Sequence, residues 1–87
     1  MTVDTERAVA MTSAPERKPI VPLDVRALGP PKPLAETLEA LTDLDEGVLV
    51  QLNDRKPMHL YPKLDDRGYA YETIEIEGTT VTVIWEK

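Results

Sequence analysis

Few side chains in this chain of 87 residues can take part in covalent or metal chemistry. The sequence has no cysteine, which excludes disulfides, thiolate metal sites and cysteine nucleophiles. Its single histidine, His59, has Asp54, Asp65 and Asp66 near it in sequence. Such residues bind a metal only when several elements bring them together. We therefore interpret His59 as a surface residue, expect no cofactor, and keep a metal site at His59 as the alternative.

No pattern of residues indicates catalysis. Ser13 lies in the polar N-terminal segment, so a serine–histidine–carboxylate triad has no recognisable basis. There is no glycine-rich phosphate-binding loop. The paired acids Asp65-Asp66 and Glu75 with Glu77 fall in predicted turn and strand positions that are exposed. We expect a protein that is not an enzyme.

The stretch from Leu23 to Pro33 carries the side chains best placed to bind a partner. It reads as the end of a strand, a proline-stiffened corner and the start of a helix, where free N–H groups favour an anion. The prolines remove some of these donors, so the alternative is a corner with a purely structural role and solvated basic residues. The candidate partner- or anion-binding residues are Arg26, Gly29, Pro30, Pro31 and Lys32.

Three other polar or aromatic features each have a structural explanation. Asp24 is expected to accept hydrogen bonds from the corner that follows it. Asn53-Asp54, with Pro57 behind it, is either a binding loop or the cap of a helix. The tyrosines at 61, 69 and 71 form either an exposed patch for a partner or ordinary sheet packing.

Composition narrows the classes of partner. The net charge is −6 with the acidic residues scattered, which argues against nucleic acid and anionic membranes. No window of the sequence is apolar enough to span a bilayer, and no signal peptide is recognisable. We expect a cytoplasmic monomer that binds a protein.

The elements that would position these residues follow from apolar spacing. Residues 1–19 are polar and predict a disordered tail, and residues 20–87 form the domain. Strands are predicted over 20–25 and 48–52, with a helix between them that starts at Pro33 and buries a leucine stripe. Pro22 confines the first strand to a strand start or a sheet edge. A right-handed crossover of this kind makes the two strands parallel.

The second half predicts a helix and a hairpin. The helix is capped by Asn53-Asp54 and has Pro57 in its first turn, and because of Pro62 we expect it to be short or kinked and to end before Asp65. Strands over 69–77 and 80–86 meet at a turn around Gly78. The predicted fold is α+β: a two-layer sandwich with the order β-α-β-α-β-β, a mixed four-stranded sheet and two helices on one face. The other face is expected to be open and to carry Tyr69, Tyr71 and threonines.

The corner also carries a resemblance. Asp24 and the run Pro31-Lys32-Pro33 resemble the Leu-Asp strand and the Cys-Pro-x-Pro helix start of the TusA/SirA/YedF superfamily of sulfur carriers, with the carrier cysteine position occupied by Pro30. Over residues 20–87 the chain looks like a cysteine-less branch of that superfamily that is classed as a domain of unknown function. The features shared with that branch are Leu23 to Arg26, Asn53-Asp54, Pro57 and Leu60-Tyr61.

The resemblance implies a TusA-like fold without persulfide chemistry, since proline offers no nucleophile. It leads us to expect a non-enzymatic adaptor that binds a protein partner at the mouth of the first helix. The alternative is a domain that binds a small ligand, an anion or a metal and is linked to redox or nitrogen-oxide metabolism, the setting in which the branch occurs.

Overall fold

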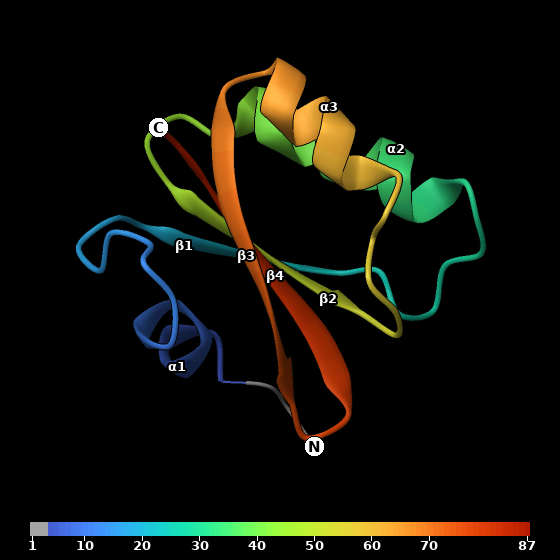
Figure 1. Ribbon diagram of the computed structural model, residues 1–87, viewed down its shortest axis with the longest axis horizontal. Coiled ribbons are helices and arrows are strands. Elements are labelled where there is room, and N and C mark those ends of the chain that lie inside the picture. The colour runs from blue at the N-terminus through green and yellow to red at the C-terminus, as the bar shows by residue number, and fades with distance from the viewer. Residues whose placement is uncertain (1–3) are drawn as a thin grey trace.

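A mixed sheet of four strands organises the chain, which the computed structural model describes over residues 4–87 (Figure 1). The strands lie in the order β1-β2-β4-β3, with β1 parallel to β2 and β4 antiparallel to both of its neighbours. This confirms the predicted α+β fold and its parallel first pair. The elements are α1 (Thr5–Ala10), β1 (Ile20–Asp24), α2 (Lys32–Asp43), β2 (Val48–Asn53), α3 (Leu60–Asp66), β3 (Tyr69–Ile76) and β4 (Thr79–Glu86).

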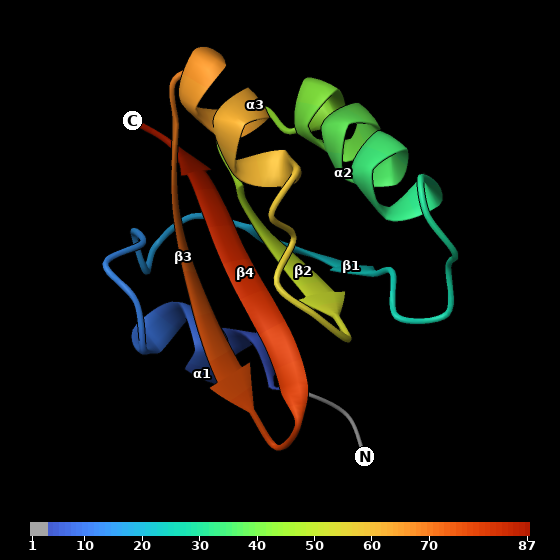
Figure 2. The ribbon, with the colours of Figure 1, turned by 45° about the vertical axis from the view of Figure 1, so that its right-hand side comes forward.

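Helices α2 and α3 cover part of one sheet face, and α1 lies on the other (Figures 1 and 2). The core under α2 and α3 is aliphatic and consists of Leu41, Leu49, Leu60, Leu64 and Ile84. Tyr61, Tyr69 and Tyr71 pack against this same core, and the rings of Tyr61 and Tyr71 stack with their centroids 4.9 Å apart. The expectation that Tyr69 and Tyr71 lie on an open face is therefore wrong, because they lie on the covered face, where the Tyr69 hydroxyl donates to the Leu41 carbonyl of α2 and the Tyr71 hydroxyl to Asp65 of α3.

The opposite face is covered by the N-terminal segment. In α1, Ala8 and Val9 are buried against a second core that includes Val50, Val81 and Val83. Asp4 caps the helix by accepting hydrogen bonds from the N–H groups of Glu6 and Arg7. The structure thus differs from the expected disordered tail over 1–19, because the small apolar side chains of α1 pack on an apolar face of the sheet. Residues 1–3 of that tail lie outside the described residues.

Helix α3 begins later than the sequence predicted. Asn53 ends β2 instead of capping a helix, and the N-cap of α3 is His59. Pro62 is the third residue of the helix. The first N–H groups of a helix have no intrahelical acceptor, so proline is tolerated there. The helix is short, as expected, with seven residues, but it continues past Pro62 to Asp66 instead of ending before Asp65.

The hairpin between β3 and β4 closes through a two-residue turn. Glu77 and Gly78 have φ angles of 50° and 82°. Positive φ at both central positions is the mark of a type I′ turn, whose twist matches that of paired strands. The predicted hairpin is confirmed. Within residues 4–87, no helix is long and apolar enough to cross a membrane.

The packing of α1 gives the first prediction. Val9→Asp places a charge in the core under α1 and should lower the free energy of unfolding by about 2–4 kcal/mol, because an unpaired carboxylate cannot stay buried. It should also increase binding of a hydrophobic dye, since the sheet face becomes exposed. Ala10→Asp, on the exposed side of the same helix, is the control and should change stability little. Equal effects of the two variants in urea denaturation would show that α1 does not pack on the sheet.

Candidate functional site

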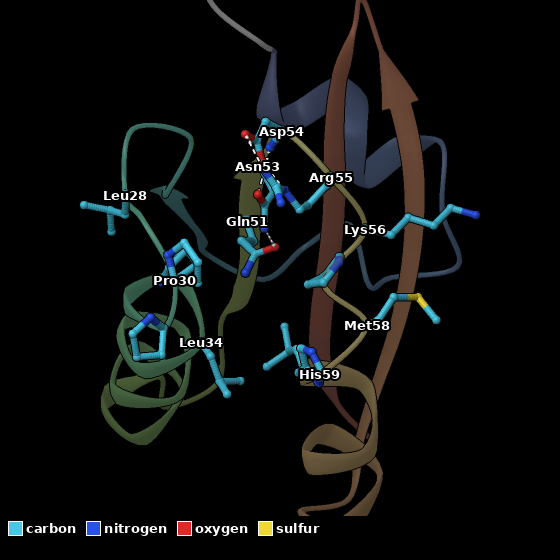
Figure 3. Close-up of a pocket in the computed structure, with 14 residues that line it drawn as sticks. Leu28, Pro30, Leu34, Gln51, Asn53, Asp54, Arg55, Lys56, Met58 and His59 are labelled. Carbon is cyan, nitrogen blue, oxygen red and sulfur yellow. Dashed lines mark hydrogen bonds and ion pairs between the residues drawn. The ribbon is translucent and has the colours of Figure 1, made fainter.

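A groove of about 470 Å³ opens beside the carboxyl ends of the parallel strands β1 and β2. One wall is the corner between β1 and α2, with Leu28, Pro30 and Leu34 (Figure 3). The other wall is the loop from β2 to α3, with Met58 and His59. Ligands of open α/β sheets bind at the carboxyl ends of the strands, where crossover connections diverge. The position and concavity of this groove make it the candidate site.

The floor of the groove is polar and belongs to β2. Gln51 and Asn53 line it and are only 1% and 5% exposed. The Gln51 Nε2 donates a hydrogen bond of 2.7 Å to the Thr37 Oγ1 on α2, and the Thr37 hydroxyl donates one of 2.7 Å to the Pro33 carbonyl oxygen. The Asn53 Nδ2 reaches the Gln51 Oε1 at 3.4 Å. We call these three residues, Thr37, Gln51 and Asn53, the polar chain.

The polar chain joins the two layers of the fold. Thr37 is fully buried on the helix, and Gln51 is buried in the sheet. A buried amide without a hydrogen bond is costly, so this contact fixes how α2 sits over β2. The start of α2, where Pro30, Pro31 and Pro33 form one wall of the groove, is thereby held in place relative to the floor on β2.

The mouth of α2 offers few donors to an anion. The N–H of Lys32 donates to the Gly29 carbonyl oxygen at 3.0 Å, and that of Ala35 donates to the Pro31 carbonyl oxygen at 3.2 Å. Pro33 has no N–H, so the backbone N–H of Leu34 is the remaining donor in this turn. Anion binding through the helix mouth alone is therefore poorly supported by the backbone geometry.

The structure separates the five predicted site residues. Pro30 and Pro31 line the groove, whereas Arg26, Gly29 and Lys32 are not among its lining residues. Sequence reasoning placed all five at one surface because they are adjacent along the chain. The Arg26 side chain is instead bound to Asp24.

Arg26 has its own partner at the end of β1. Its Nε and Nη2 donate to the Asp24 Oδ1 and Oδ2 at 2.9 and 2.7 Å, and its backbone N–H donates to the Asp24 Oδ1 at 3.0 Å. These hydrogen bonds lower the pKa of Asp24 to about 2, and the same contact raises the pKa of Arg26. The expectation that Asp24 accepts hydrogen bonds from the following corner is confirmed. The Arg26 side chain is held within that corner by the same carboxylate.

The second wall is charged but exposed. Arg55 Nε donates to the Asp54 Oδ1 at 3.1 Å, and this bond lowers the pKa of Asp54. Lys56 is exposed, and no ion pair is formed by it in the described chain. Lys56 belongs to the wall opposite the prolines, and its side chain points away from the groove (Figure 3).

His59 lines the groove together with Asp54, whereas Asp65 and Asp66 are not among its lining residues. Asp65 accepts hydrogen bonds from the Tyr71 hydroxyl at 3.1 and 3.2 Å, and desolvation, followed by this contact, raises the pKa of that tyrosine. Across residues 4–87, no group of three histidine or acidic side chains is placed to hold a metal ion. The structure gives no support to the metal alternative at His59.

Sequence reasoning missed the polar chain and the exposed side chains Leu28 and Met58. Gln51 carried a usable signal, because it is the one polar side chain within Val48–Leu52. A polar residue in a strand buried on both faces needs a partner from the covering helix. Thr37, on the buried side of α2, was the available one.

Thr37→Val tests whether the polar chain is a structural unit. The substitution keeps the shape but leaves the Gln51 amide without its acceptor, so we expect a loss of about 1–3 kcal/mol in unfolding free energy. Thr42→Val is a matched control, since the Thr42 hydroxyl also donates to a carbonyl four residues earlier, at 3.1 Å, but is exposed. It should cost less than about 0.5 kcal/mol. Similar losses for both variants, measured by thermal and urea unfolding, would contradict the role of the polar chain.

Comparison with known proteins agrees with the fold. A family model described as "Uncharacterized conserved protein (DUF2249)" matches residues 22–86, which leaves α1 outside the match. The crystal structure of a SirA-like protein from Desulfitobacterium hafniense matches with a TM-score of 0.64 and 25% identity, covering 77% of this chain and 99% of that one. No curated protein matches the sequence. The resemblance to a cysteine-less branch of the SirA/TusA-like superfamily is thereby confirmed.

Proposed function

Since the chain belongs to the DUF2249 family of uncharacterised conserved proteins, we propose that it is a non-enzymatic, cytoplasmic binding domain that holds a segment of a protein partner in the groove. The observation that carries this proposal is the concave groove itself, whose two rims each carry an exposed apolar residue, Leu28 and Met58, 36% and 63% exposed, with side chains that point outward (Figure 3). Exposed apolar side chains gathered around a concave surface are a mark of interaction sites.

The chemistry of the groove fits binding better than catalysis. Its lining combines prolines, aliphatic side chains and two amides, and the chain has no thiol to carry sulfur. The corner that carries a cysteine in the sulfur carriers it resembles carries Pro30 here, which contributes to an apolar wall. The proposed surface keeps Pro30 and Pro31 from the sequence-based set and adds the loop from β2 to α3.

A small-ligand domain is the second candidate, and the volume of the groove favours it. About 470 Å³ lies within the range of roughly 300–1,000 Å³ that small-molecule sites occupy. The two candidates differ in what the groove retains from the host: a protein for the first, a metabolite for the second. Mass spectrometry of the purified domain under native conditions would show a bound metabolite.

A capture experiment with matched methionine variants tests the main proposal. Met58→Asp should reduce capture of the partner from host extract by about tenfold or more, because a carboxylate at an apolar contact costs more than about 1.4 kcal/mol. Met11→Asp is the control, since Met11 is also exposed, at 49%, but follows α1 on the opposite face. The captured proteins are compared by quantitative mass spectrometry.

A third variant in the same capture experiment distinguishes binding in the groove from binding at the start of α2. The double variant Arg26→Glu with Lys32→Glu reverses charge at the two basic residues outside the groove lining. Capture that survives this change and is lost with Met58→Asp supports the groove. A partner that Met58→Asp retains, or that Met11→Asp also loses, would contradict the proposal.

A further inference from the structure

The sheet face under α1 is an aliphatic surface that the N-terminal segment covers with small side chains. Six buried residues of β2, β3 and β4 contribute to this surface, which we call the α1 face: Val48, Val50, Leu52, Ile76, Val81 and Val83. The residues of the N-terminal segment that are buried against it are Ala8, Val9 and Ala14. The cover therefore contributes much less apolar volume than the surface beneath it.

The burial pattern of α1 shows how a helix lies on this face. Ala8 and Val9 are buried, and Thr5 and Thr12, three residues to either side, are half-buried. This spacing of i, i+3, i+4 and i+7 is that of an amphipathic helix that docks by one side. The Thr12 hydroxyl is used within its own segment, where it donates to the Val9 carbonyl oxygen at 2.9 Å. Two of the four docking positions are thus polar in α1, although the α1 face is aliphatic.

A hollow of about 900 Å³ beside α1 shows where a larger side chain fits. Thr5 and Val9 line it from the helix, Ile20 and Pro22 line it from β1, and the charged segment 16–18 also borders it. An apolar side chain longer than that of Thr5 would reach toward Ile20, which packs at the margin of the same core. Because the chain must return to β1, α1 ends after six residues. A helix from another molecule has no such restriction on its length.

The polar contacts that hold α1 to the sheet are few. Across residues 4–18, one hydrogen bond reaches the rest of the described chain, from the Ser13 N–H to the Glu72 Oε2 at 2.8 Å. A helix of six residues is not stable alone, so α1 folds only while it is docked. Segments with few buried contacts open locally more often than core strands do. The family match begins at residue 22, so it includes the strands of the α1 face but not the helix that covers them.

We propose that the α1 face is a second interaction surface, which binds an amphipathic helix of a protein partner and which α1 covers until that helix displaces it. The partner helix is longer than α1 and carries a large apolar residue where α1 has Thr5. The α1 face lies on the opposite side of the sheet from α2 and the groove floor (Figures 1 and 2). Binding of this helix is therefore independent of the segment proposed to bind in the groove.

Peptides that copy α1 test the proposal on the whole chain. The probe is a capped peptide with the sequence of residues 4–14 and the substitution Thr5→Leu. Trp85, the one tryptophan of the chain, packs at the margin of the α1 face, so its fluorescence should change in a saturable way. In nuclear magnetic resonance, the amide signals of Val81 and Val83 should shift, and that of Ser13 should move as α1 is displaced. The same peptide without the substitution should bind at least about threefold more weakly, because it buries less apolar surface.

Variants of the chain show whether α1 competes with the peptide. Glu72→Ala removes the acceptor of the Ser13 N–H, so α1 opens more often and the peptide should bind about threefold more tightly. Glu75→Ala is the matched control, since Glu75 lies on the same strand with its side chain on the other face, and should leave the affinity unchanged. Val9→Asp should bind the peptide about tenfold or more tightly, because its own helix no longer competes. Glu72→Ala lies outside the core and keeps the test independent of the stability of Val9→Asp.

Four results would overturn the proposal. Equal peptide affinity of the unmodified chain, Glu72→Ala and folded Val9→Asp would show that α1 does not compete for the surface. Absence of binding to both variants would show that the α1 face does not accept a helix from another molecule. Shifts centred on Gln51 and Asn53 would place the peptide in the groove. A concentration-dependent dimer of the unmodified chain that the peptide dissociates, seen in sedimentation, would make α1 of a second copy the occupant. Partner capture by Met58→Asp tests the groove separately from all of these.

Discussion

The fold depends on one buried amide in the middle of the sheet. Every residue of β2 is buried, and Gln51 brings a polar group into that strand. Its hydrogen bond to Thr37 satisfies the amide and ties α2 to the sheet. The start of α2, with its prolines, therefore faces the end of β2 across an open groove. The same contact that the core requires places two amide side chains, Gln51 and Asn53, at the floor of the groove.

The spacing of apolar residues predicted the strands that pair within the sheet. Val48 to Leu52 is continuous enough to identify a fully buried strand, and alternation over 69–86 predicted the hairpin with its turn at Gly78. Helix α1 was missed because six residues are too few to be stable alone, so the helix depends on the sheet face that it covers. The start of α3 was missed because Asn53-Asp54 and Pro57 resemble a helix cap, although the backbone stays extended through Asn53.

The candidate site was predictable only in part. Pro30 and Pro31 were assigned to a binding surface from the corner itself, and the structure places them in the wall of the groove. Arg26 was assigned to the same surface, but Asp24 two residues earlier holds it through a two-point ion pair. Gln51 signalled from the sequence that a polar partner was needed, but its grouping with Thr37 and Asn53 depends on how α2 crosses over β2 and could not be read from local sequence. The corner thus contributes Pro30 and Pro31 to the groove, while Arg26 is engaged with Asp24.

The most direct test of the central claim is the footprint of the captured partner on this protein. Backbone and side-chain amide signals of the isotope-labelled chain would be recorded with and without the purified partner. The account predicts that the largest changes fall on Leu28, Gln51, Asn53 and Met58, with α1 unaffected. Changes centred on α1 and the sheet face beneath it, or on Arg26 and Lys32 alone, would contradict the account.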